Sequence, residues 1–163
     1  MTITVRLASS RLHATKRALG ILFALLVGLS PLAACSGENR LVLHTATGDH
    51  PFTVEVVDTP ESRAQGLMFR QSLAPDAGML FDFKENREVA FWMRNTFIPL
   101  DMIFIAPNGT VETIHVNARP HDPTSIPSGK PVQFVLEIPG GRSVEIGLKP
   151  GDRVEHPRMK PAP

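Results

Sequence analysis

Turn-forming residues divide the chain after residue 40 into short apolar runs, and this spacing is the feature that most restricts the fold. Turn signals such as Gly48 to Pro51 and Pro107 to Gly109 recur at intervals of roughly 8–12 residues. The runs between them are rich in β-branched and aromatic residues, and they have the length of strands. The pattern predicts a mostly β fold, namely a compact, mostly antiparallel sandwich or barrel-like single domain over residues 40–156.

One short helix is predicted within this β pattern. Thr59 suits the position that caps a helix, Pro60 the first helical position, and Gly66 the end. Residues 117–130 contain three prolines and predict a long polar loop, residues 35–39 a tether, and residues 157–163 a disordered tail. The predicted strands are 40–47, 52–58, 78–83, 88–93, 100–105, 111–116, 133–138, 143–146 and 153–156.

The N-terminus has the pattern of a targeting segment. Residues 1–17 carry four basic residues and no acidic one, and residues 18–29 carry no charge at all. This uncharged run is shorter than a membrane-spanning helix, so residues 1–34 are predicted to be a signal peptide. Leu32 to Cys35 resembles a bacterial lipobox, which implies a lipid on Cys35. We therefore expect an exported, periplasm-facing lipoprotein anchored in the membrane; the alternative is a soluble periplasmic or secreted protein with a free Cys35 thiol.

The composition excludes several classes of function. All 16 acidic residues follow Cys35 together with 13 basic ones, so this part of the chain has a net charge of −3, which predicts no nucleic-acid partner. The single cysteine excludes a disulfide framework, and the five histidines after it never lie two to four residues apart, so we predict no metal and no cofactor. No catalytic motif indicates an enzyme, and the sequence leaves that question open.

Residues 89–104 form an almost entirely apolar stretch that contains the only tryptophan and a few polar side chains. The polar residues have two interpretations. They satisfy backbone groups where strands bend, or they line a pocket whose walls are Phe91, Trp92 and Phe97. Glu137 raises the same question, because strand alternation places it on one face with Val135.

Three motifs resemble an uncharacterised family known as domain of unknown function 192. They are residues 66–70, 78–81 and 91–104, and residues 135–137, 140–141 and 151–152 match the later pattern in order. The resemblance covers roughly residues 40–156, and it implies a compact β-rich domain that is often exported. The family supplies no activity. The residues that match its motif and are candidates for ligand binding are Arg70, Trp92, Asn95, Asp101 and Glu137.

Three functions follow as hypotheses. The first is a binding domain for a small or oligomeric ligand, carbohydrate being one example, in which Trp92 stacks on a sugar face and the polar candidates bind hydroxyls. The second is a hydrolase that uses Asp101 and Glu137 as acid and base. The third is a structural or interaction protein of the cell envelope, with the loop 117–130 as its contact surface.

Overall fold

The structure is a computed structural model that describes residues 37–160. The predicted signal peptide, Cys35 and residues 161–163 lie outside the described part. No helix within residues 37–160 is long and apolar enough to cross a membrane. The elements in chain order are η1 (Gly37–Asn39), β1 (Arg40–Thr45), β2 (Gly48–Val57), α1 (Pro60–Gln65), β3 (Ala77–Arg87), β4 (Ala90–Phe91), β5 (Leu100–Ile105), β6 (Val111–Ala118), β7 (Ile126–Pro127), β8 (Val132–Pro139), α2 (Arg142–Glu145) and β9 (Arg153–Glu155).

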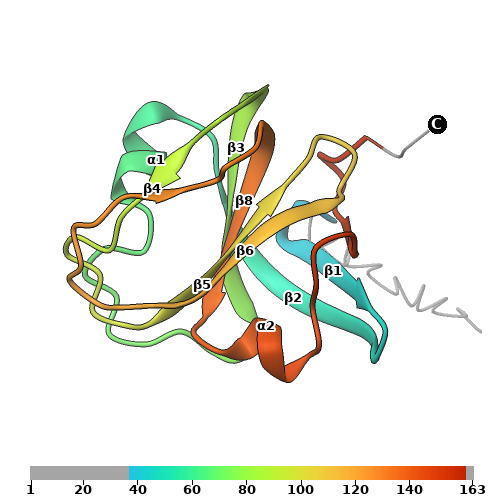
Figure 1. Cartoon of the computed structure of the whole chain (residues 1–163), viewed down its shortest axis with the longest axis horizontal. Helices are drawn as coiled ribbons and strands as arrows, with labels where there is room; N and C mark the ends of the chain where they lie inside the picture. The colour runs from blue at the N-terminus through green and yellow to red at the C-terminus, as the bar shows by residue number, and fades with distance from the viewer. Residues whose placement is uncertain (1–36, 161–163) are drawn as a thin grey trace, which may run out of the picture. The chain divides into compact units, whose positions relative to one another are not determined.

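Seven of the strands form one curled sheet in the order β6-β5-β8-β3-β2-β1-β9 (Figure 1). Every neighbouring pair is antiparallel except β2 and β3. The sheet curls far enough for its two edges to meet. Thr110 and Arg153 form a bridge there, and the Val154 N–H donates to the Gly109 carbonyl at 2.7 Å. The predicted mostly β, barrel-like single domain is confirmed.

Helix α1 provides the crossover that the parallel pair β2 and β3 requires. Thr59 caps it as the sequence predicts: its hydroxyl accepts from the Ser62 N–H at 3.2 Å, and the Ser62 hydroxyl accepts from the Thr59 N–H at 3.1 Å. The helix lies at one end of the sheet beside β4, and α2 lies near the other end (Figure 1). The two helices therefore mark different ends of the domain.

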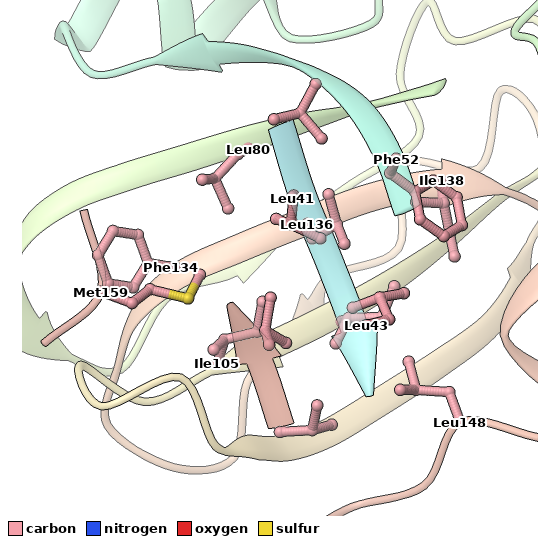
Figure 2. Close-up of a cluster of buried hydrophobic side chains, with 14 of the residues drawn as sticks. Leu41, Leu43, Phe52, Leu80, Ile105, Phe134, Leu136, Ile138, Leu148 and Met159 are labelled. Carbon is pink, nitrogen blue, oxygen red and sulfur yellow. The ribbon is translucent and has the colours of Figure 1, made fainter. Parts of the chain in front are cut away.

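The sheet buries apolar side chains on both faces. One set, which we call the inner cluster, fills the curl of the sheet, and Leu41, Leu80 and Leu136 reach it from three strands (Figure 2). A second set, the outer cluster, lies on the opposite face and includes Phe81 and Phe104. Strands β3, β5 and β8 contribute alternate residues to each cluster, and they are therefore buried on both faces.

Two segments differ from their predicted structure. Residues 143–146 form most of α2 and the residue after it rather than a strand, because Asp101, some forty residues earlier, accepts hydrogen bonds at the start of this helix. Within the predicted strand 88–93 only Ala90 and Phe91 pair, with β7. β7 lies within the Pro-rich loop 117–130, so part of that loop is packed against the rest of the domain, and the Ser128 hydroxyl accepts from the Val89 N–H at 3.1 Å.

The predicted tether and tail also differ where they are described. Gly37–Asn39 forms one 3-10 turn. Residues 157–160 are packed against the domain instead of forming a free tail, because Met159 belongs to the inner cluster and Arg158 forms an ion pair with Asp58 at 2.8 Å. Residues 157–160 are held in place because Arg158 binds a carboxylate and Met159 buries its apolar side chain in the core.

Candidate functional site

A pocket of about 310 Å³ lies on the outer face of the sheet, between α1, β3, β4 and the middle of β8. Its walls are mainly apolar and aromatic, and a few polar side chains face it. The lining residues are Pro60, Arg63, Ala64, Gln65, Gly66, Leu67, Met68, Phe81, Phe83, Arg87, Ala90, Phe91, Trp92, Thr96 and Glu137. The volume is at the lower end of the range for small-molecule sites.

The end of α1 forms one wall, and a glycine determines how closely it approaches the sheet. Gly66 has a φ of 49° and lies over the ring of Phe81. A Cβ atom at Gly66 would lie 3.2 Å from that ring, and a side chain is disfavoured at this φ in any case. Glycine at this position lets the chain turn and carry Leu67 into the outer cluster.

Aromatic rings in edge-to-face contact form another part of the lining. The ring centroid of Phe91 lies 5.0 Å from that of Phe81 and 6.2 Å from that of Phe83, with the planes near perpendicular. Trp92 lies at the mouth and is 52% exposed. The guanidinium carbon of Arg94 lies 5.7 Å from the centre of the Trp92 ring. The pocket therefore has an aromatic wall and an accessible indole at its entrance.

Glu137 is the buried acid of this pocket. It is only 5% exposed, and its neighbours across β3 and β5 are Met79 and Met102. No residue in 37–160 forms an ion pair or hydrogen bond with its carboxyl group, and burial raises the pKa of that group to about 8. A carboxyl group that is buried without a partner is costly to ionise, so Glu137 is mostly protonated at neutral pH.

Two arginines lie at the other end of the pocket. The guanidinium groups of Arg63 and Arg87 lie 5.0 and 5.1 Å from the centre of the Phe83 ring. Arg63 donates to the carbonyls of Asp58 and Asp82, at 2.6 and 3.0 Å, and Arg87 pairs with a neighbouring glutamate. Phe83 is four residues beyond the partner of Glu137 on β3, which is about 13 Å along the strand.

Asp101 lies outside this pocket and has a complete set of partners. Its side chain is fully buried, and its carboxylate accepts the backbone N–H groups of Asn117, Gly141 and Ser143 at 2.7–2.8 Å and the Ser143 hydroxyl at 2.6 Å. It shares a strand face with Ile103 of the inner cluster, whereas Glu137 lies on the outer face. The two carboxyl groups therefore do not converge on one site.

The remaining candidates from the sequence lie around the pocket rather than inside it. Arg70 is exposed and pairs with Glu55 at 2.7 Å. Asn95 is exposed, and its side-chain nitrogen lies 3.9 Å from the sulfur of Met68, a lining residue. Of the three aromatic residues predicted as pocket walls, Phe91 and Trp92 line the pocket, whereas Phe97 packs edge-to-face on Phe69 outside it.

The sequence did not predict the contributions of α1 and β3 to the site. In the sequence alone, nothing distinguishes Arg63 from other helix residues. Nothing distinguishes Phe81, Phe83 or Arg87 from other strand residues either. They become lining residues only because α1 folds back over β3. The spacing Thr59 to Gly66 was the one available signal, since a six-residue helix between paired strands must cover one face of the sheet.

The described residues offer few other chemical groups at the site. No group of three or more histidine, cysteine, aspartate or glutamate side chains in this part of the chain is arranged to hold a metal ion. Among the pocket-lining residues Glu137 is the single acid, and Arg63 and Arg87 are the basic residues. The arrangement offers an apolar slot with one ionisable group at its base.

The fold and the site define the protein as a small curled-sheet domain with an apolar pocket that contains one acid. Comparisons with known proteins place this domain in a family. The chain belongs to DUF192, a family described as "Uncharacterized ACR", whose pattern matches residues 42–156. The chain is similar to a crystal structure from Sinorhizobium meliloti 1021, provisionally described as a transcription regulator, at 52% identity and a TM-score of 0.70, over 72% of this chain and 92% of that one.

A second similar structure comes from Novosphingobium aromaticivorans DSM 12444 and is described as a protein of unknown function. The identity is 42% and the TM-score 0.70, over 71% of this chain and 83% of that chain. No curated protein matches the chain. The family is therefore established, and it is a family whose function is unknown.

Proposed function

We propose that the domain is a ligand-binding module that takes a small molecule into the pocket beside α1. The observation that carries the proposal is Glu137: the residue is 5% exposed, its carboxyl group has no hydrogen-bond or ion-pair partner within residues 37–160, and it lines an apolar pocket. A buried polar group without a partner is destabilising, and such groups concentrate at functional sites. A ligand that donates a hydrogen bond would supply the missing partner.

A sugar ring is one ligand that suits this chemistry. The indole of Trp92 is half exposed at the mouth and offers a flat surface to the apolar face of a ring. Hydrolysis by a pair of carboxyl groups is not part of the proposal. Asp101 and Glu137 lie on opposite faces of the sheet, so they cannot act on the same bond as acid and base. We also propose no nucleic-acid partner, since the chain after Cys35 has 16 acidic and 13 basic residues.

The binding proposal predicts a fluorescence signal, because Trp92 is the only tryptophan of the chain. We expect titration with at least one member of a panel of glucose, glucosamine and N-acetylglucosamine to change the Trp92 emission saturably. Ala64 lines the pocket from the exposed side of α1, so Ala64→Phe should fill the slot without disturbing the core and lower the affinity at least about tenfold.

Ala64→Ser is the matched control and should bind as the wild type does. Phe97→Ala is a second control, because Phe97 is an exposed aromatic residue that does not line the pocket. A binding signal that is the same in Ala64→Phe and the wild type would place the ligand elsewhere. A flat titration across the panel would remove support for a sugar ligand.

We further propose that the domain is exported and anchored in the membrane by a lipid on Cys35. The proposal rests on the basic segment, the short apolar run and the residues Leu32 to Cys35, all outside the described structure. Two or three acyl chains bind a membrane stably, at about 0.8 kcal/mol for each buried methylene. We expect Cys35→Ala to release the exported protein from the membrane fraction; a variant that stays membrane-bound would contradict lipid anchoring.

A further inference from the structure

We infer that the ligand of the pocket presents a cationic nitrogen, an ammonium or a guanidinium group, to the carboxyl group of Glu137. The inference rests on the binding function proposed above and names the chemical class of its ligand. Three observations support it: Glu137 has no counter-charge within residues 37–160, aromatic rings line the same pocket, and the arginines near the pocket are engaged elsewhere.

The first argument is the missing counter-charge. A carboxylate in an apolar site needs a cation or several hydrogen-bond donors, as Asp101 has on the other face of the sheet. Glu137 has neither within residues 37–160, and its neighbours across the strands are Met79 and Met102. The pocket is the direction from which a partner can arrive, because Glu137 lines it.

The second argument is the aromatic wall. Phe91 contacts Phe81 and Phe83 edge to face in the pocket that Glu137 also lines, and Trp92 lies at the entrance. The faces of such rings attract cations, most strongly where water is excluded. The protein already uses this attraction at the rim, where Arg94 lies over Trp92. Aromatic faces combined with a carboxylate favour a cation over an anion.

The third argument concerns the charged groups on every element around Glu137. Helix α1 contributes Arg63 and the end of β3 contributes Arg87; both are held over Phe83, about 13 Å along β3 from the level of Glu137. Arg94 follows β4 and lies over Trp92. Strand β5 contributes Met102 on this face, since Asp101 faces the other way. On the next strand of this face, β2 contributes Glu55 beside Met79, and Glu55 is already paired with Arg70. Within residues 37–160 no positive charge therefore forms an ion pair with Glu137.

Protonation distinguishes a cationic ligand from a neutral one. Burial raises the pKa of Glu137 to about 8, so at pH 7 most molecules carry the neutral acid. A cation prefers the carboxylate and must displace this proton when it binds, so its affinity rises with pH until Glu137 is ionised. A neutral ligand that accepts a hydrogen bond from the protonated acid shows the opposite trend.

The test compares choline, whose positive charge is permanent, with its neutral isostere 3,3-dimethylbutan-1-ol. We expect the affinity for choline, measured by calorimetry and by Trp92 emission, to rise roughly 50-fold between pH 6 and pH 8 and then to level off, as the ionised fraction of Glu137 does. Calorimetry in two buffers of different ionisation enthalpy should show close to one proton released for each choline bound at pH 7. Glu137→Gln should lose both the affinity and its pH dependence.

Two further ligands test whether the cationic group belongs to a sugar or to an amino acid. Glucosamine presents an ammonium group on a sugar ring, and Nα-acetyl-lysinamide presents one on an amino-acid side chain. Equal or tighter binding of dimethylbutanol, a choline affinity that does not vary with pH, or no choline binding at any pH would each overturn the inference. In any of these cases a neutral sugar that binds and is excluded by Ala64→Phe would leave the proposed binding function standing.

Discussion

Asp101→Asn is expected to lower the free energy of unfolding by about 3–5 kcal/mol, and the melting temperature by roughly 10–20 °C. The carboxylate accepts four hydrogen bonds in the interior, three from backbone N–H groups and one from the Ser143 hydroxyl. An amide has one accepting oxygen, and its NH₂ group would face N–H donors that have no other acceptor. Chemical denaturation followed by circular dichroism measures the loss.

The graded control is Ser143→Ala. It removes only the hydroxyl donor and leaves the three backbone hydrogen bonds, so we expect a loss of about 1 kcal/mol. The residues that Asp101 holds include Asn117 and Gly141, whose φ values of 55° and 85° are unfavourable for most residues. A loss below about 1 kcal/mol for Asp101→Asn would show that these turns hold their conformation without the carboxylate.

The second large effect is expected for Glu137 and depends on pH. Burial raises the pKa of its carboxyl group to about 8 in the folded protein, from an ordinary value of 4.5. Between these values the folded state binds more protons than the unfolded state, so the free energy of unfolding falls as pH rises. The contribution is complete below pH 4.5, is lost progressively up to about pH 8 and then stays constant. A shift of this size corresponds to at most about 5 kcal/mol.

Glu137→Gln should remove this pH dependence, and urea denaturation at intervals from pH 5 to pH 9 would measure it. The pKa of His44 is raised mainly by its hydrogen bond to Asp49, and the pKa of His156 is lowered by burial, so both histidines also make stability depend on pH. Both are present in wild type and variant, so the difference between the two curves isolates Glu137. Glu88→Gln, at an exposed position, is the control. Parallel curves for wild type and Glu137→Gln would contradict the raised pKa.

The same comparison separates stability from function. Above pH 8 the wild type retains an ionised, buried carboxylate that costs stability, and Glu137→Gln should therefore be the more stable protein there. A residue that weakens the fold and is nevertheless present is expected where binding requires it. The variant should combine higher stability at pH 9 with lost affinity for a cation.

Elements with strong local signals were predictable from the sequence. Thr59, Pro60 and Gly66 predicted α1 to within a residue, because capping and the φ preferences of proline and glycine act within a few residues. The turn Pro107 to Gly109 predicted the hairpin of β5 and β6 for the same reason. Strand β5 itself followed from a run that is apolar except for Asp101.

Elements that depend on distant partners were not predictable. The alternation in residues 143–146 suits a strand, and the carboxylate that accepts the N–H of Ser143 comes from β5. The packing of residues 157–160 depends on a place for Met159 in the inner cluster and on a carboxylate, Asp58, a hundred residues away. A pattern within a short window contains no information about such partners.

The candidate site was predictable in part for the same physical reason. Strand alternation placed Glu137 on one face with Val135, and Val135 is indeed in the outer cluster on that face. Alternation could not distinguish Glu137, which has no partner among the described residues, from Asp101, which has four hydrogen bonds, because both are acids within apolar runs. That difference arises where α2 begins and β6 ends, since both supply N–H groups to Asp101.

The meeting of the sheet edges bears on how the protein behaves at high concentration. Residues 109–111 hydrogen-bond to residues 151–154, so over this stretch the two edge segments satisfy each other's backbone groups. An unsatisfied edge would be a template on which a second chain could extend the sheet and begin to aggregate. A Cβ atom at Gly109 would collide with the carbonyl oxygen of Val154, so a side chain at this buried turn residue would separate the two edges and leave their backbone groups open to a second chain.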